Sequence, residues 1–153
     1  MTSFTFDMSQ TAIMRTKVLT LSGALPFLGA LVLMFFPIPH LDAALLASTY
    51  GALIIAFVAG TQWGLFLTFS ERSPIDLMVY SNLLTLAAWA GLLFLPIAFA
   101  LALQAVCFLC LLFLDHRFLI SDIIPPWYFS MRRLVTSIVV VTLLALTIAL
   151  VLT

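Results

Sequence analysis

The chain has 153 residues, of which 65% are hydrophobic and 8% charged, and six basic residues balance six acidic ones. A soluble domain carries about 25% charged residues and could not enclose this much apolar surface, so the composition excludes a soluble globular fold. The zero net charge gives no reason to expect a nucleic-acid partner. With a mean hydropathy of +1.28, residues 1–153 are expected to form a single domain within a membrane.

Five stretches without charged residues are each long enough to cross a bilayer, for which a helix needs about 20 apolar residues. Lipid cannot hydrogen-bond an exposed backbone, so each stretch must be helical. In chain order, the predicted spans are residues 18–36, 43–69, 77–95, 97–114 and 134–152. We therefore predict an all-α fold, a polytopic transmembrane bundle of five helices.

The basic residues all fall on one side of this predicted bundle. They lie before the first span, between the second and third spans, or between the fourth and fifth, as Arg15, Lys17, Arg72, Arg117, Arg132 and Arg133. By the positive-inside rule, the N-terminus is expected inside, in the cytoplasm or matrix, and the C-terminus outside. The expected location is a bacterial inner membrane, or the mitochondrial inner membrane if the source is eukaryotic.

Residues 115–133 join the last two predicted spans and contain Pro125 and Pro126, which interrupt a helix. We predict a loop that lies along the cytoplasmic interface. Because arginine binds phosphate and carboxylate, an anionic lipid headgroup is a candidate ligand there. The candidate headgroup contacts are Arg117, Trp127, Tyr128, Arg132 and Arg133. The alternative is a set of topology anchors with an aromatic belt; an ion pair between Asp115 and an arginine fits either interpretation.

Small residues recur at intervals of four in the second predicted span. The row consists of Ser48, Ala52, Ala56, Gly60 and Gly64. Such rows let another helix approach closely and pack by van der Waals contact. The row predicts either helix packing inside the bundle or a face for association with a second copy.

Polar and aromatic side chains within the spans are candidates for a ligand site, because small-molecule pockets are mostly apolar with a few hydrogen-bonding groups. They are Tyr50, Thr61, Gln62, Trp63, Asn82, Trp89 and Gln104. The alternative is hydrogen bonding between helices. Burial of an unpaired amide is costly, so Gln104 is expected to pair with Gln62 or Asn82.

Chemistry that needs ionisable groups is not predicted. No ionisable residue lies at the middle of a predicted span, which counts against a proton relay. Cys107 and Cys110 lie in an apolar stretch and are expected to serve packing. Asp115 and His116 are adjacent, so on a helix they project about 100° apart and do not form a dyad. We predict no catalytic residue, metal or resident cofactor, although a bound lipid or quinone is compatible with the bundle.

Several strings along the chain form one recognisable set. They are residues 21–27, Tyr50 to Ala52 with Phe57, residues 60–64, Trp89, Asp115, residues 126–128 and residues 132–136. Together they resemble the transmembrane protein sixty-nine family, a bacterial and mitochondrial family of five-span membrane proteins of unknown function. The resemblance covers nearly the whole chain and implies a fold and a membrane location, but no activity.

Three functions are compatible with these features. The first is a non-enzymatic membrane protein that acts through helix packing with partner membrane proteins, or in their assembly. The second is a binder or carrier of a small hydrophobic molecule, such as a lipid, quinone or tetrapyrrole, in a pocket within the bundle. The third is a lipid-modifying enzyme at the cytoplasmic edge. The expected partners are membrane lipids, other membrane proteins or a second copy.

The charge distribution predicts the topology directly. A phosphatase reporter that is active only outside the cytoplasm, fused after Thr153, is expected to be active in cells. The same reporter inserted between the second and third spans should be inactive. An inactive C-terminal fusion with normal expression would contradict the five-span topology.

Overall fold

The computed structural model describes residues 9–69 and 76–152, and within them the chain forms six helices and no strand. The helices are α1 (Gln10–Ser22), α2 (Leu25–Phe35), α3 (Ala43–Phe69), α4 (Leu77–Phe94), α5 (Ile97–Ile120) and α6 (Pro126–Leu152). With α1 and α2 taken as one run, Gln10–Phe35, five runs are long and apolar enough to cross a membrane. The prediction of an all-α bundle of five membrane-type helices is therefore confirmed.

The first run differs from the predicted span 18–36. Helix α1 begins at Gln10, where the Ser9 hydroxyl accepts a hydrogen bond from the Ala12 amide at 3.2 Å. The run then breaks at Gly23 and Ala24, just before Pro26, whose ring cannot be accommodated inside a continuous helix. The span search missed this extension because it began only after the last charged residue, whereas the structure continues the helix through Arg15 and Lys17.

Helices α3 and α4 closely match the predicted spans 43–69 and 77–95. Each begins after an aspartate whose carboxylate satisfies free backbone amides of the first turn. Asp42 accepts from the amides of Ala44 and Leu45 at 2.8 and 3.0 Å, and Asp76 accepts from those of Met78 and Val79 at 3.2 and 3.3 Å. Arg72, which contributes to the predicted topology, lies outside the described residues.

The prediction of a loop at residues 115–133 is wrong for most of its length. Helix α5 continues to Ile120 and α6 already begins at Pro126, so only residues 121–125 connect them. Asp122 adopts a left-handed φ of 53°, and the Ile123 amide donates to the Phe118 carbonyl at 2.9 Å. This is a Schellman-type helix end, and Pro126 then fits the first position of the next helix. The prediction ended each span at the nearest charged residue. Asp115 and Arg132 are instead buried together inside α5 and α6.

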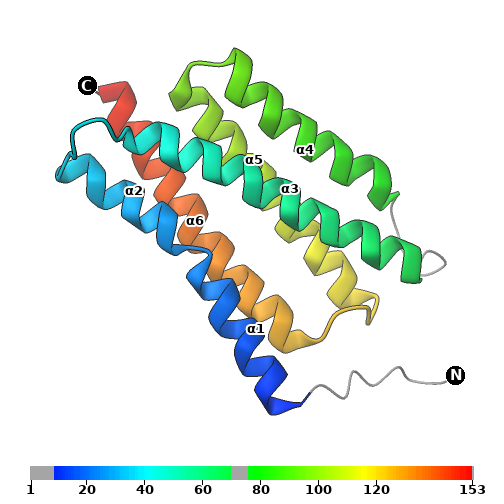
Figure 1. Ribbon diagram of the computed structural model, residues 1–153. Helices are drawn as coiled ribbons and strands as arrows, with labels where there is room; N and C mark the ends of the chain where they lie inside the picture. Colours follow the sequence, from blue (N-terminus) through cyan, green and yellow to red (C-terminus); the bar gives the residue numbers. More distant parts are fainter. Residues whose placement is uncertain (1–8, 70–75, 153) are drawn as a thin grey trace, which may run out of the picture.

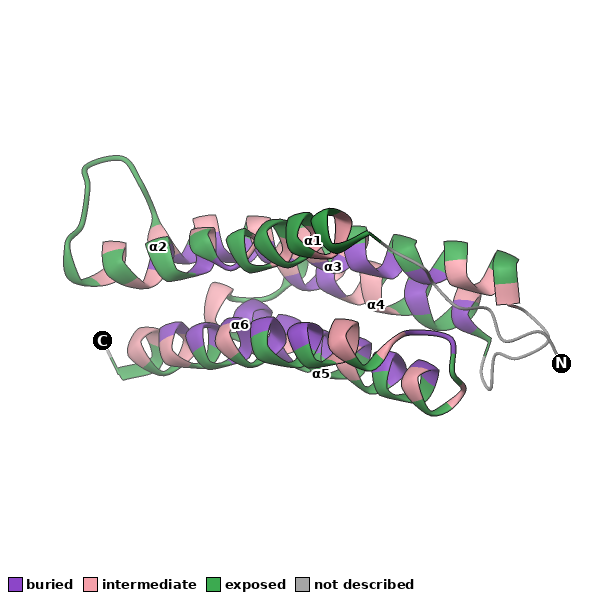
Figure 2. Ribbon diagram, turned by 90° about the horizontal axis from the view of Figure 1, so that it is seen from below, coloured by how far each residue is buried: buried purple, intermediate pink, exposed green. Residues whose placement is uncertain are grey.

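The helices form an antiparallel bundle (Figure 1). Seen from below, α5 and α6 lie in one layer and α1, α2 and α3 in the other (Figure 2). The main core lies between the layers, around fully buried side chains such as Phe27, Ile55, Leu101 and Leu143. Large apolar side chains cover the outer faces, as expected for surfaces in contact with lipid.

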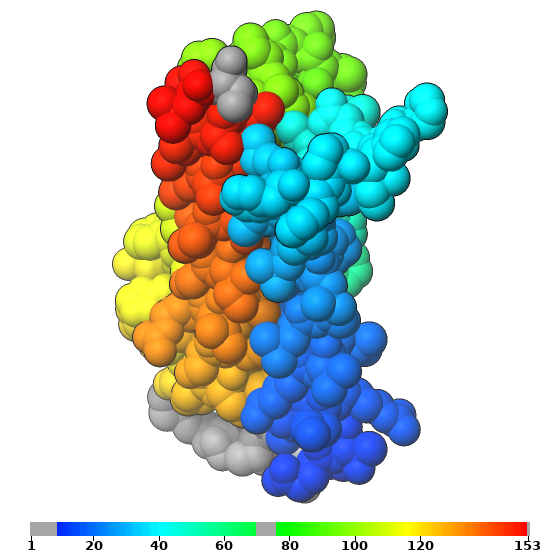
Figure 3. Space-filling model, turned by 90° about the vertical axis from the view of Figure 1, so that its left-hand side faces the viewer, coloured from blue at the N-terminus to red at the C-terminus, as the bar shows by residue number. Residues whose placement is uncertain are grey.

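Helix α1 is the exception in this packing. None of its residues is buried, and its contacts are made mainly with α6. The space-filling view shows α1 and α2 lying along α6 on one side of the molecule (Figure 3). Because few apolar contacts hold it, α1 is expected to be among the least stable elements of the bundle.

The small-residue row packs within the chain at one end only. Ser48 is fully buried, whereas Gly60 and Gly64 are exposed, with no neighbouring atom within 4 Å of an added Cβ. Among the described residues, these two glycines therefore make no close helix contact. The close approach occurs instead at Gly51, where an added Cβ would collide with Oε1 of Gln104 on α5.

This contrast predicts opposite effects for two matched substitutions in α3. Gly51→Ala is expected to lower the free energy of unfolding by about 1–3 kcal/mol, because it overfills the contact between α3 and α5. Gly60→Ala should be neutral or stabilising by up to about 1 kcal/mol, because alanine favours the helix. Unfolding of the purified protein in detergent measures both. Equal effects at the two positions would contradict the packing described here.

Candidate functional site

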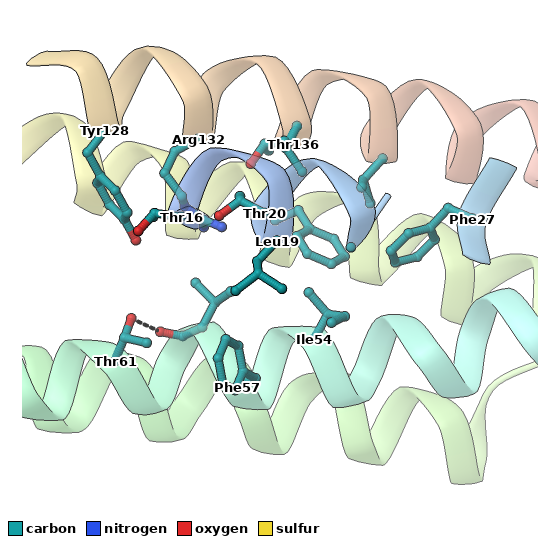
Figure 4. Close-up of a pocket in the computed structure, with 15 residues that line it drawn as sticks. Thr16, Leu19, Thr20, Phe27, Ile54, Phe57, Thr61, Tyr128, Arg132 and Thr136 are labelled. Carbon is teal, nitrogen blue, oxygen red and sulfur yellow. Dashed lines mark hydrogen bonds between the residues drawn. The ribbon is translucent and has the colours of Figure 1, made fainter. Parts of the chain in front are cut away.

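A cavity of about 440 Å³ lies between α1, α3, α5 and α6. Most of its wall is apolar and includes Phe27, Ile54, Val58, Phe108 and Val139. Figure 4 shows Phe27 at one end of this cavity and Tyr128 at the other. The volume falls within the range of about 300–1,000 Å³ that is typical of small-molecule pockets.

Polar groups gather at the Tyr128 end of the cavity. Figure 4 shows Thr16 and Thr20 of α1 close to Arg132 of α6, with Thr61 of α3 on the facing side. Since Thr16 and Thr20 are four residues apart, they lie on one face of α1. The cavity thus has an apolar body and one polar end.

Two of these threonines already use their hydroxyl protons. Thr16 donates to the carbonyl of Ala12 at 2.9 Å, and Thr61 donates to the carbonyl of Val58 at 2.7 Å. Such bonds satisfy the hydroxyl within its own helix and leave its lone pairs free. Thr16 and Thr61 therefore offer acceptors to the cavity.

Arg132 forms a buried ion pair beside the polar end. Its Nε donates to Oδ2 of Asp115 on α5 at 2.9 Å, and the two side chains are only 8% and 7% exposed, respectively. The predicted pair between Asp115 and an arginine is confirmed, but it joins two helices inside the bundle instead of holding a loop. Among the described residues, Nη2 of Arg132 has no hydrogen-bond partner, although it is buried.

A second cavity, of about 530 Å³, continues from the first. The two share Thr16, Thr61 and Tyr128, and the second extends along Gly64 to Trp127 at the start of α6. We refer to the two cavities together as the groove. Its lining extends from Phe27 in the core to residues 123–125, which belong to the connection between α5 and α6.

The predicted ligand pocket between the second and third spans differs from the groove. Of its seven residues, Thr61 alone lines the groove. Trp63 and Trp89 are 37% and 54% exposed, and exposed Asn82 donates to the Met78 carbonyl of its own helix at 2.8 Å. Tyr50 of α3 donates to the Gly23 carbonyl at 3.2 Å, so this hydrogen bond links α3 to the break between α1 and α2.

The two buried glutamines do not pair with each other. Gln104 donates through Nε2 to the carbonyl and the hydroxyl of Ser48, at 2.8 and 3.3 Å, so the predicted partners Gln62 and Asn82 were wrong. Gln62 is 1% exposed, and neither of its amide atoms has a hydrogen-bond partner among the described residues. Gln104 therefore ties α5 to α3, whereas Gln62 makes no comparable link.

The candidate headgroup residues separate into two groups. Trp127, Tyr128 and Arg132 line the groove, whereas Arg117 and Arg133 are exposed. The sequence analysis missed Thr16, Thr20 and Thr136, which also line it. Their one available signal was the interval of four between Thr16 and Thr20, but Thr16 lies before the predicted first span of residues 18–36.

The candidates for other chemistry are dispersed. Asp115 is buried against Arg132, whereas His116 is exposed and lies against Phe129, with ring centroids 5.5 Å apart. Asp115 and His116 therefore share no site. The cysteines are free, with Cys107 buried and Cys110 exposed. Within the described ranges, no group of three or more potential metal ligands occurs.

Five apolar helical runs and the buried polar contacts between them define a polytopic helical membrane protein. Residues 13–149 match the family described as "Protein of unknown function (DUF3429)", so the chain belongs to that family. "Transmembrane protein 69" of Xenopus tropicalis is 27% identical over 132 residues, which cover 82% of this chain and 50% of that protein. The chain thus spans about half the length of this curated relative. The resemblance seen in the sequence is confirmed, and no solved structure matches the chain.

The ion pair predicts a strong dependence of stability on both partners. Asp115→Leu should cost about 3–5 kcal/mol of unfolding free energy, because it leaves the Arg132 guanidinium buried without its carboxylate. The double variant Asp115→Leu with Arg132→Met should recover most of this loss, since no charge remains buried. Unfolding in detergent measures all three proteins. A single variant as stable as the parent would show that the pair is solvated.

Proposed function

We propose that the protein binds a small apolar or amphiphilic molecule of the membrane in the groove. The observation that carries this proposal is the groove itself, with an apolar body that ends in Tyr128 and the buried Arg132. Such an arrangement is typical of ligand pockets, where apolar walls supply affinity and a few polar groups fix orientation. Lipids and quinones are suitable ligand classes.

A crevice filled by any acyl chain is the simpler alternative. Such a crevice needs no polar group, and a buried cation is costly unless its hydrogen bonds are used. Arg132 keeps one buried Nη2 without a partner among the described residues. This favours a ligand that brings a hydrogen-bond acceptor to that position.

The position of α1 supports an accessible site. Thr16, Leu19 and Thr20 of α1 line the groove, while no residue of α1 is buried. The helix is separated from α2 by the break at Gly23 and Ala24. A weakly packed wall of this kind is suited to move when a molecule enters from the bilayer.

Helix packing with a partner membrane protein is a second candidate. Gly60 and Gly64 present a small-residue face that no described residue of the chain covers, and such faces favour close helix contacts in lipid. A lipid-modifying enzyme receives no comparable support, because Asp115 is engaged by Arg132 and His116 is exposed.

The orientation proposed from the sequence has one structural support. The start of α1, the end of α5 and the start of α6 lie at the same end of the bundle (Figure 1). They carry the basic residues of the described ranges, Arg15, Lys17, Arg117, Arg132 and Arg133. By the positive-inside rule we assign this end to the cytoplasm or matrix, in an inner membrane.

Filling the groove should displace its ligand. Val135 is buried and lines the first cavity, so Val135→Phe is expected to remove a co-purified molecule that native mass spectrometry detects on the parent protein. The matched control Leu134→Phe places the same ring on the neighbouring residue, which is 54% exposed, and should retain the molecule.

The same spectra distinguish the two candidate functions. A parent protein without any bound molecule, but present as a dimer that Gly60→Leu converts to a monomer, would favour helix packing over ligand binding. Equal retention of the molecule by the Val135 and Leu134 variants would contradict binding in the groove.

A further inference from the structure

The polar end of the groove has unused hydrogen-bond donors. Arg132 donates through Nε to Asp115, and its Nη2, which carries two N–H groups, is buried without a partner among the described residues. Within the described ranges, the hydroxyl of Tyr128 on the same helix makes no hydrogen bond either. A group that only accepts hydrogen bonds, such as a carboxylate or phosphate, suits these donors.

The charges around this end also favour an anion. Asp115 neutralises Arg132 locally, but exposed Arg15 and Lys17 belong to α1 and exposed Arg133 to α6, and these two helices begin at the same end of the bundle (Figure 1). The second cavity is lined by Pro125, Trp127 and Tyr128, where α6 begins. The N-terminal end of the α6 helix dipole adds partial positive charge there.

The apolar part of the groove gives the rest of the ligand its character. From Arg132 the cavity continues along α6 past Val135 to Val139 and ends near Phe27. Seven residues of helix correspond to roughly 10 Å. A hydrocarbon chain suits this apolar continuation.

We propose that the ligand is an anionic amphiphile whose carboxylate or phosphate head group binds Nη2 of Arg132 and the Tyr128 hydroxyl, with its hydrocarbon chain along α6 toward Phe27. This inference rests on the proposed function and specifies its ligand class. It places the head group inside the bundle, beside the buried ion pair, whereas exposed Arg117 and Arg133 remain outside the site. A charge-assisted hydrogen bond is about twice as strong as a neutral one, so the site should bind an ionised head group more tightly than a neutral one.

Quenching of Trp127 fluorescence tests the head-group preference. Trp127 lines the second cavity, and the variant Trp63→Phe with Trp89→Phe leaves it as the one tryptophan. In nanodiscs of zwitterionic lipid, stearic acid brominated next to its carboxyl group should quench it saturably, at concentrations at least about tenfold lower than its methyl ester. Adding Val135→Phe should remove the saturable quenching by both probes.

Variants of the donor separate recognition from folding. In the same background, Asp115→Leu with Arg132→Met removes the pair without leaving a buried charge, and it should bind the acid and the ester equally. The matched control Arg133→Met, at an exposed position of the same helix, should keep the parent's preference. Loss of the preference in the Arg133 variant alone would overturn the assignment to Arg132.

Competition distinguishes the two sources of the anion. Displacement of the brominated acid by unlabelled oleic acid, or by a lysophosphatidic acid, supports the proposal and identifies a carboxylate or a phosphate as the better head group. Equal saturable quenching by acid and ester in the parent protein would overturn the anionic inference and leave the proposed function standing. Absence of saturable quenching by either probe would contradict both.

Discussion

The arginine of α6 and the aspartate of α5 meet inside the bundle, and the arrangement around the groove depends on that contact. A buried charge is tolerated only when it is paired and hydrogen-bonded, so Arg132 and Asp115 fix how α5 and α6 lie against each other. Both residues sit well inside helices whose connection is only residues 121–125. The guanidinium that completes this contact is the same group that borders the groove.

The groove itself results from how the first helical run is built. Between Gln10 and Phe35 the chain breaks at Gly23 and Ala24, where Tyr50 donates to the Gly23 carbonyl. Helix α2 then packs into the core through Phe27 and Ala30, whereas α1 remains on the surface. The space between α1, α3 and α6 is therefore closed by a helix with little burial of its own. The break between α1 and α2 therefore helps to form the groove that we propose as a site for a membrane-soluble molecule.

Polar contacts join the helices at depth in places that apolar packing alone would not define. Gln104 bonds to Ser48 across α5 and α3, and Gly51 leaves room for that amide. In lipid, where apolar side chains gain little by facing one another, such contacts and close approaches determine which faces meet. Gly60 and Gly64, from the same row, lie on a face that the chain does not use internally. One end of the row, at Ser48, therefore faces the interior of the bundle, whereas the other end, at Gly60 and Gly64, faces outward.

The sequence alone determined the class of protein, the number of spans and the family. The length of an apolar, charge-free run is a local property, and it decides whether a helix can cross the bilayer. It also indicated that Asp115 pairs with an arginine. The tertiary structure decided that this arginine is Arg132 and that the pair is buried, because the pairing depends on the antiparallel contact of α5 and α6. The residues predicted for a ligand site are dispersed for a similar reason: residues on α3 and α4 share a face within each helix, but Trp63, Asn82 and Trp89 are exposed in the bundle. Only the packing of α1 brought Thr16 and Thr20 to the groove, because no pattern within one helix specifies the partner against which it lies.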